Sequence, residues 1–221
     1  CSAAGVYTQN KVKGAPVIVT RENLKKSNGI ARAILANSKN ANTCNFDGIE
    51  IAEKACKLAA DQLGIKPEEV IIGSTGVIGQ RLSIQPFEEY MKPLAEGMTA
   101  DGNDRAAYAI MTTDTVMKQV AVEFKIGDAI CRMGGMAKGS GMIHPNMATM
   151  LSVTTTDAKI SHDLLQEMVS EIVSDSFNMI SVDRDTSTND TYLVLANGES
   201  GVEIKAGTNE YVKFKEALSF V

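Results

Sequence analysis

The stretch from Gly134 to Leu151 holds the densest group of residues in this chain that could take part in chemistry. It contains four glycines, the cation of Lys138, one proline and the small-residue pair Ala148-Thr149. Glycines allow the main chain to turn tightly and to approach another group closely. The stretch therefore indicates a glycine-rich loop where backbone, cation and hydroxyl groups meet, and three kinds of chemistry could use them.

Phosphate binding is the first of these. Gly139-Ser140-Gly141 follows Lys138, and backbone amides beside a cation can hold an anion. The lysine precedes the glycines, however, and the chain has neither G-x-x-x-x-G-K-[ST] nor a strand followed by G-x-G-x-x-G. The order of the residues argues against a phosphate site.

A serine hydrolase is the second. Ser140 or Ser74 could pair with His144, but neither serine stands in the nucleophile motif G-x-S-x-G. Pro145 gives the backbone after His144 an irregular course, so we interpret this histidine as a loop residue. We interpret the other histidine, His162, as a residue in the first turn of a helix.

An N-terminal nucleophile is the third. A threonine hydroxyl is a weak nucleophile without a base, and the nearest base is the residue's own α-amine, with a pKa of about 7.7 to 8.0 once the chain is cut. Ala148 adds little bulk, and Pro145 with the glycines could strain the Ala148-Thr149 bond. Attack by the Thr149 hydroxyl on the Ala148 carbonyl would give an ester that water opens. The chemistry alone does not distinguish Thr149 from the threonines at 154–156.

Alternating helices and strands must position these residues. Apolar residues recur at helical spacing between Asp47, a candidate cap, and Gly64, a candidate end, which predicts a helix packed on a sheet. Further helices are predicted at Ile84–Ala95, at Asp104–Met111 and after Ser161. Strands are predicted at Val17–Val19, Ala33–Leu35, Val70–Ile72, Val120–Ile126, Ile130–Met133, Leu151–Thr156, Met179–Val182 and Tyr192–Leu195.

Two turns connect these elements to the candidate chemistry. The strand at 70–72 runs into the glycine-rich turn Ser74–Gly79, which could present backbone N–H groups at a sheet edge. Gly127-Asp128 is typical of a two-residue hairpin turn, and the hairpin leads into the Gly134–Leu151 stretch. Because strands and helices are interleaved throughout, the fold class is α/β or α+β.

Composition excludes several classes of function. The 22 Lys and Arg residues are outnumbered by 27 Asp and Glu residues, and the net charge of -5 argues against a nucleic-acid partner. The apolar runs are strand-sized and far shorter than the roughly 20 residues that a membrane helix needs. The four cysteines stand far apart without a C-x-x-C pair, which argues against a zinc site or a disulfide framework and indicates a reducing, cytoplasmic location.

The run from Lys138 to Leu151 closely resembles the self-cleavage and active-site motif of the bifunctional ornithine acetyltransferase / N-acetylglutamate synthase family. The resemblance extends over essentially all 221 residues. Other matching blocks follow in the family's order: Asn40–Asn42, Ser74–Gly79, Ala109–Thr115 and Asp185–Asp190.

The resemblance implies a catalytic mechanism. Thr149, freed by cleavage after Ala148, would take the acetyl group of N2-acetylornithine as an ester and pass it to glutamate, in arginine biosynthesis. By the family's pattern Thr75 and Gly76 would form the oxyanion hole. Thr112 and Lys138 match substrate-contacting positions, and a lysine cation suits a substrate carboxylate. No metal or bound cofactor is implied; acetyl-CoA is a candidate co-substrate, because some members accept it as donor.

The resemblance also implies an architecture. Sheets are expected between helix layers, as in N-terminal-nucleophile enzymes. Residues 1–148 would form an α-chain portion and 149–221 the start of a β-chain, packed together as one acetyltransferase domain. By resemblance, the pieces from one precursor stay associated and the heterodimer pairs again.

The sequence departs from the family's pattern in three turns and in length. Lys39 and Arg184 stand where glycine is usual, and the turn at Cys44-Asn45 differs, which puts local turn geometry in question. Family members begin earlier than Cys1 and continue beyond Val221, so the chain is expected to be incomplete at both ends. The alternatives are a related aminopeptidase or amidase, in which water resolves the acyl-enzyme, and an inactive fragment or assembly partner.

Overall fold

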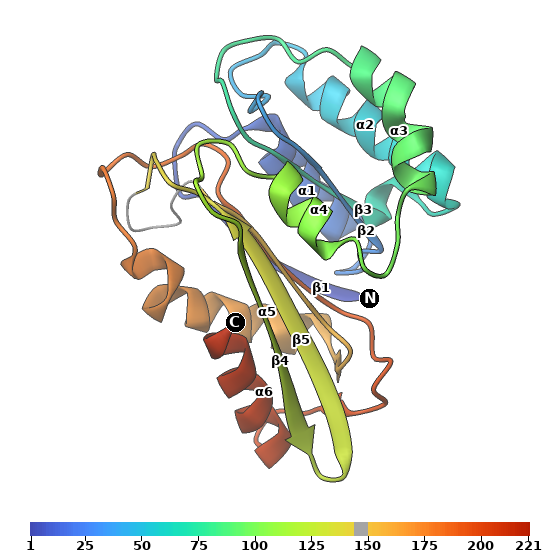
Figure 1. The fold of residues 1–221 in the computed structure, drawn as a ribbon, viewed down its shortest axis with the longest axis vertical. Coiled ribbons are helices and arrows are strands. Elements are labelled where there is room, and N and C mark those ends of the chain that lie inside the picture. Colours follow the sequence, from blue (N-terminus) through green and yellow to red (C-terminus); the bar gives the residue numbers. More distant parts are fainter. Residues whose placement is uncertain (144–149) are drawn as a thin grey trace.

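The computed structural model describes residues 1–143 and 150–221, and stacks them as helices, sheet, sheet and helices (Figure 1). The larger sheet has five strands in the order β1 (Ser2–Tyr7), β8 (Thr191–Ala196), β6 (Leu151–Thr156), β5 (Ala129–Lys138) and β4 (Lys118–Ile126). Strands β6 and β8 are parallel, whereas the other neighbours are antiparallel. Strands from before and after the uncharacterised segment 144–149 therefore share one sheet.

The smaller sheet consists of two parallel strands, β2 (Ala33–Asn37) and β3 (Val70–Ser74). All five residues of β3 are buried, since both of its faces are covered. Val70 and Ile72 face one core while Ile71 faces another, as the alternation of a strand requires.

Helices cover the outer face of each sheet. On the smaller sheet, α1 (Ala15–Lys26) and α2 (Gly48–Leu63) pack against β3, and α3 (Gln85–Glu96) packs on α2. On the larger sheet lie α5 (His162–Ile172) and α6 (Asn209–Phe220). A third core joins the two sheets, where Ile71 meets Ala3 and Leu193. The predicted α/β class, with sheets between helix layers, is confirmed.

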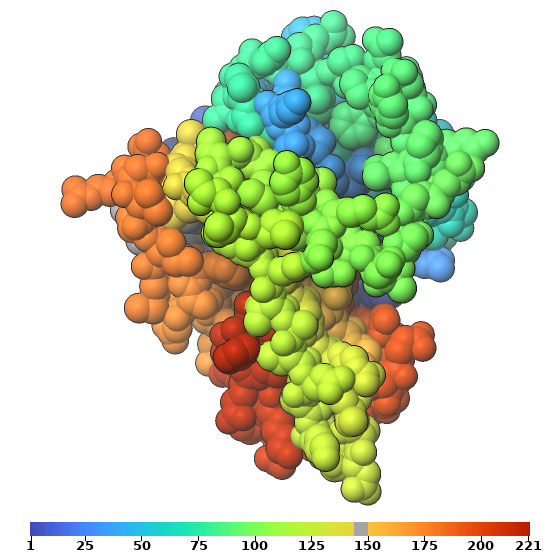
Figure 2. All heavy atoms as spheres, viewed as in Figure 1, coloured from blue at the N-terminus to red at the C-terminus, as the bar shows by residue number. Residues whose placement is uncertain are grey.

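The remaining elements are short. Helix α4 (Asn103–Ala109) lies before β4, and a two-stranded parallel ribbon joins β7 (Lys159–Ile160) to β9 (Glu203–Ile204). Three 3-10 turns occupy Pro67–Glu69, Val173–Asp175 and Phe177–Met179. The space-filling view shows the β4–β5 hairpin at the lower end of the molecule with the C-terminal helix beside it (Figure 2).

Helix α1 also covers the free edge of β3. The Thr20 hydroxyl donates to the Ile72 carbonyl at 2.7 Å and accepts from the Ile72 amide at 2.9 Å. The Asn23 amide donates to the Val70 carbonyl at 2.8 Å. These side chains replace the missing strand, and so protect an edge that would otherwise expose unpaired backbone groups.

Most of the predicted elements are confirmed. Helix α2 begins after Asp47 and ends at Gly64, which has the left-handed conformation expected of a C-terminal glycine. The helix after Ser161 is present, and the Ser161 hydroxyl accepts from the Leu164 amide. The hairpin turn at Gly127-Asp128 is also present, because Ile126 pairs with Ala129.

Three predictions are wrong. Val17–Val19 lies in helix α1 and not in a strand, because Pro16 suits the first turn of a helix and the valines pack inward. Met179–Val182 is not a strand: a 3-10 turn ends at Met179, and the segment is exposed and pairs with none of the strands described. The first part of the supposed loop at 134–151 is strand β5, which continues to Lys138.

Strand β5 contains two glycines, and at Gly135 the neighbouring residues leave little room for a side chain. A Cβ on Gly135 would lie 2.6 Å from a methyl carbon of Val221 and 3.0 Å from the Thr154 hydroxyl. Gly134 pairs with Ala121 on one side and Thr155 on the other. The sequence pattern also missed strand β1, whose apolar residues do not alternate strictly, and helix α6.

The three turns that depart from the family's pattern each contain a residue in a strained conformation. Lys39, Cys44 and Arg184 have positive φ angles of 75°, 61° and 67°. This is the left-handed region, which costs a non-glycine residue about 1 to 2 kcal/mol. At Lys39 and Arg184 the turn is therefore formed without the glycine that would relieve the strain.

Candidate active site

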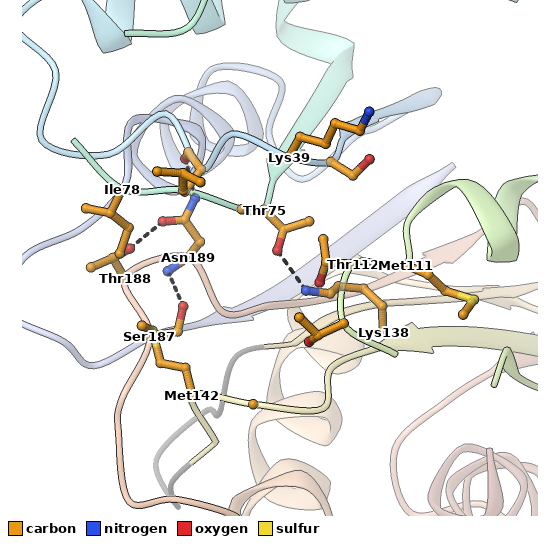
Figure 3. A pocket seen from close by; sticks show the side chains of 16 residues that line it. Lys39, Thr75, Ile78, Met111, Thr112, Lys138, Met142, Ser187, Thr188 and Asn189 are labelled. Atoms are coloured by element: carbon orange, nitrogen blue, oxygen red, sulfur yellow. Dashed lines mark hydrogen bonds between the residues drawn. The ribbon is translucent and has the colours of Figure 1, made fainter. Parts of the chain in front are cut away.

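A cavity of about 640 Å³ lies where the turn after β3 meets the end of β5 (Figure 3). Thr75, Gly76, Thr112 and Lys138 all line it, although they come from three separate parts of the chain. The loop that carries Lys39 and the segment 187–189 complete the wall. The structure thus brings together four of the residues predicted for the site.

Lys138 is a buried cation at the end of β5. Only 3% of its surface is exposed, and its ammonium donates to the Thr75 hydroxyl at 2.7 Å. Burial lowers the pKa of Lys138, while Asp114 and Asp190 act in the opposite direction. Because the Thr75 oxygen accepts this bond, its own hydrogen is free to point to another group in the cavity.

Gly76 cannot be replaced without moving the backbone. Its φ is 133°, and a Cβ here would lie 2.1 Å from the carbonyl carbon of Lys39. The two strands of chain are held together by bonds from the Val77 amide to Lys39 and from the Thr75 amide to Asn37, both 3.0 Å. The glycine-rich turn of the sequence is therefore a close crossing of two backbones.

Asp114 ties the segment after α4 to the end of β5. Its carboxylate accepts from the Gly139 amide at 2.8 Å, the Thr112 amide at 3.3 Å and the Lys118 ammonium at 2.5 Å. Burial alone would raise the pKa of Asp114, but these three donors outweigh it and hold the pKa below its usual value. The carboxylate thereby fixes Thr112 beside the same strand that carries Lys138.

Two aspartates hold the chain on either side of segment 144–149. Asp183 accepts from the amides of Met142 and Ile143 at 2.6 and 2.7 Å. Asp190 accepts from the Met150 amide at 2.8 Å. Burial raises the pKa of Asp190 to about 8, against the lowering effects of the Met150 amide and Lys138.

The predicted nucleophile Thr149 and its neighbour Ala148 lie outside the described residues, as does His144. The strand that follows them is well placed: Leu151 pairs with Lys138 on one side and Thr191 on the other. The chain therefore enters β6 directly beside Lys138.

The other candidates for catalysis have different partners. The Ser74 hydroxyl donates to the Asn37 side chain at 2.6 Å, and the Ser140 hydroxyl bonds that of Thr113 at 2.6 Å. His162 is in the first turn of α5, as predicted, where its ring contacts the Ala3 carbonyl at 2.7 Å. Neither serine has a described histidine as partner.

Asn189 is a site residue that the sequence did not single out. Its amide donates to the carbonyls of Ala41 and Ser74 at 2.6 and 2.9 Å. Its oxygen accepts from the hydroxyls of Thr43 and Thr188, both at 2.6 Å. The polar run 183–190 could be recognised in the sequence. Its hydrogen bonds to residues more than a hundred positions away could not, because they form only when the chain folds.

Within the described ranges, no cluster of His, Cys, Asp and Glu could hold a metal ion. None of the helices described is long and apolar enough to cross a membrane.

Sequence comparisons with known proteins cover the whole length of the chain. A model of the ArgJ family matches residues 1–221. The "Arginine biosynthesis bifunctional protein ArgJ" of Symbiobacterium thermophilum is 49% identical over 223 residues, which cover 100% of this chain and 55% of the relative. The protein of the same name from Lactococcus lactis is also 49% identical, over 99% of this chain and 54% of the relative. The chain thus spans about half the length of the curated relatives it matches.

Two solved structures are similar. The arginine biosynthesis bifunctional protein of Bacillus halodurans aligns with a TM-score of 0.59 and 35% identity, over 66% of this chain and 75% of that one. The ornithine acetyltransferase of Mycobacterium tuberculosis, solved with ornithine bound, gives a TM-score of 0.56 and 31% identity, over 67% of this chain and 76% of that one.

Proposed function

The chain belongs to the ArgJ family, and from that premise we propose that it transfers an acetyl group from N2-acetylornithine to glutamate through an acetyl ester on Thr149. The chain would first cut itself between Ala148 and Thr149. The observation that carries the proposal is the cavity that gathers Thr75, Gly76, Thr112 and Lys138 beside the start of β6.

In the first reaction, the Thr149 hydroxyl oxygen attacks the Ala148 carbonyl carbon. The peptide C–N bond breaks, and the hydroxyl proton passes to the departing nitrogen. Water then hydrolyses the ester, which leaves a carboxylate on Ala148 and a free amine and hydroxyl on Thr149. That amine is the base that the hydroxyl needs for every later cycle.

Transfer uses the same nucleophile twice. The hydroxyl attacks the acetyl carbonyl of N2-acetylornithine, its proton goes to the ornithine nitrogen, and ornithine leaves. The amine of glutamate then attacks the acetyl ester and releases Thr149. Each attack creates an oxyanion, which the Thr75 hydroxyl and the Gly76 amide would stabilise, and loss of one such donor costs about 2.7 to 4 kcal/mol.

Lys138 suits the binding of a substrate carboxylate. Its ammonium has three donors, and within the described residues it uses one, toward Thr75. A buried cation with spare donors attracts an anion strongly, because little water competes. Both amino-acid substrates carry such a carboxylate.

The pieces formed by the cut would remain together, since β5 and β6 pair over six residue pairs and β1 and β8 over another six. This supports the predicted arrangement of residues 1–148 and 149–221 as one unit. We further propose that acetyl-CoA can replace N2-acetylornithine as donor, and that the unit pairs again in the cytoplasm.

Intact-mass measurement over time tests the proposal in the full chain. We expect the wild type to yield a piece that ends at Ala148 and a piece that begins at Thr149. Thr149→Ala should remain uncut and transfer no acetyl group from N2-acetylornithine to glutamate. Thr155→Ala is the matched control, because Thr155 is an exposed threonine on β6. Cleavage or transfer by Thr149→Ala would refute the assignment.

A further inference from the structure

The segment 183–190 bonds to the chain at three places around the cavity. The first is the turn that contains Thr75 and Gly76. Asn189 donates to the Ser74 carbonyl, which belongs to the peptide group directly before Thr75. All four hydrogen-bonding positions of the Asn189 side chain are occupied, and only 5% of its surface is exposed. The side chain is therefore locked in one orientation.

The second place is the start of β6. Asp190 is fully buried, and one of its carboxyl oxygens accepts from the Met150 amide. Its other oxygen, Oδ2, has no hydrogen-bond partner in the described part of the chain. A buried acceptor without a partner is costly, so the residue at this position serves a purpose other than stability. Lys138 is the charged group whose field acts on it.

The third place is the chain before segment 144–149. Asp183 accepts from the amides of Met142 and Ile143, and the Val182 amide donates to the Ile143 carbonyl at 2.8 Å. Asp183 is exposed, so this anchor is the weaker of the two formed by aspartates.

We propose that segment 183–190 is a positioning element, in which Asn189 and Asp190, with Asp183, fix the chain on both sides of the Ala148–Thr149 bond relative to the Thr75–Gly76 turn. The inference rests on the proposed function. Asn189 fixes the position of the oxyanion donors at Thr75 and Gly76, and Asp190 fixes the position of the strand that follows the nucleophile. Because Asn189 and Asp190 are adjacent, one dipeptide holds both the Thr75–Gly76 turn and the start of β6.

The Asn189→Asp variant tests the first anchor. It keeps the shape of the side chain but turns a carboxylate toward the carbonyls of Ala41 and Ser74. We expect the rate of self-cleavage and the kcat of transfer to fall by at least about tenfold, since small errors in position have large effects on rate. KM should change by less than about twofold, because Lys138 is not touched. Asn209→Asp, on the exposed start of α6, is the matched control.

The Asp190 variants test the second anchor. Asp190→Ala removes the acceptor for Met150, and we expect cleavage to slow by at least about tenfold. Asp190→Asn keeps a carbonyl oxygen for this amide and should restore most of the rate. Hydrogen exchange at the Met150 amide should rise in Asp190→Ala and not in Asp190→Asn. Asp128→Asn, in the exposed hairpin turn, is the control.

The outcomes are separable. If the wild type is cut while folded Asn189→Asp and Asp190→Ala are cut at the same rate, the positioning role is wrong and the proposed function stands. If Asn189→Asp does not fold, the pair of Asp190 variants decides: equal rates and equal Met150 exchange would overturn the inference. A wild type that is never cut and transfers no acetyl group would remove the proposed function and this inference together.

Discussion

The Asn189 side chain makes four hydrogen bonds, three of them to residues more than a hundred positions away, and 5% of the residue's surface is exposed. By contrast, Lys57 and Asp61 on α2 form an ion pair with 64% and 54% of their side chains exposed. The first set of bonds joins distant segments of the chain, and the ion pair joins adjacent turns of one helix. Water can replace the exposed partner but cannot reach the buried one. Polar groups near the cavity should therefore be sensitive to single changes, and the surface pairs should not.

The largest effect is expected from Gly76→Ala. The new Cβ would meet the Lys39 carbonyl carbon at 2.1 Å in a backbone conformation that only glycine adopts readily. We expect the free energy of unfolding to fall by about 3 kcal/mol or more, as measured by urea denaturation. Gly79→Ala in the same turn is the control, because no described atom lies within 4 Å of its Cβ, and its positive φ should cost about 1 to 2 kcal/mol. Equal losses would show that the Lys39 backbone can move aside.

The second effect depends on pH. Asp190 has a pKa of about 8 in the folded protein against 3.8 ordinarily. Its protonated form thus contributes stability below pH 3.8, and this is lost as the pH rises through about 8. The free energy of unfolding of wild type, relative to Asp190→Asn, should fall between about pH 4 and pH 8, by at most about 1.4 kcal/mol per pH unit. A difference that stays constant with pH would mean that the buried carboxyl is charged throughout.

A third effect tests whether burial matters away from the cavity. Thr20→Val preserves shape but leaves the Ile72 amide and carbonyl without their partner. We expect a loss of about 1 to 3 kcal/mol in the free energy of unfolding. Thr155→Val, on an exposed position of β6, should stay within about 0.5 kcal/mol. If the loss were as small as in that control, burial alone would not explain why polar groups near the cavity are sensitive to substitution.

The smallest effect is expected on the surface. Lys57→Ala removes the exposed ion pair with Asp61 and should change the free energy of unfolding by no more than about 0.5 kcal/mol. Raising the salt concentration should reduce the difference further. A loss comparable to that of Thr20→Val would show that exposed ion pairs are as sensitive to substitution as buried polar groups.

Local signals in the sequence predicted the elements whose pattern reflects a single buried face. Helix α2 was readable because its apolar residues repeat toward one side between Asp47 and Gly64. Helix α1 was not, because Val17, Ile18 and Val19 favour strands, whereas the proline before them and packing against β3 favour the helix. Strand β5 was cut short in the prediction because Gly134 and Gly135 are typical of a loop, and the close neighbours that favour glycine at position 135 are not visible in the sequence.

The candidate site was predictable only in part. The resemblance named Thr75, Gly76, Thr112 and Lys138, and they line one cavity. No periodicity or spacing would have joined Thr75 to Lys138, which are 63 positions apart. Asn189 bonds the backbone carbonyls of Ala41 and Ser74. Every residue has such a carbonyl, so the sequence does not indicate which ones Asn189 contacts.

The order of the larger sheet has a consequence for how a cut protein could form. Strands β6 and β8 would belong to the piece after the cut, and they lie side by side between β1 and β5 of the piece before it. While the chain is intact, these strands meet as parts of one molecule, at an effective concentration that a covalent link can raise to about the millimolar range. After the cut, refolding would become an encounter between two molecules, and its rate would depend on protein concentration. The sheet would therefore form before cleavage, in the uncut chain. After cleavage, the protein would persist because it unfolds slowly, which is kinetic stability.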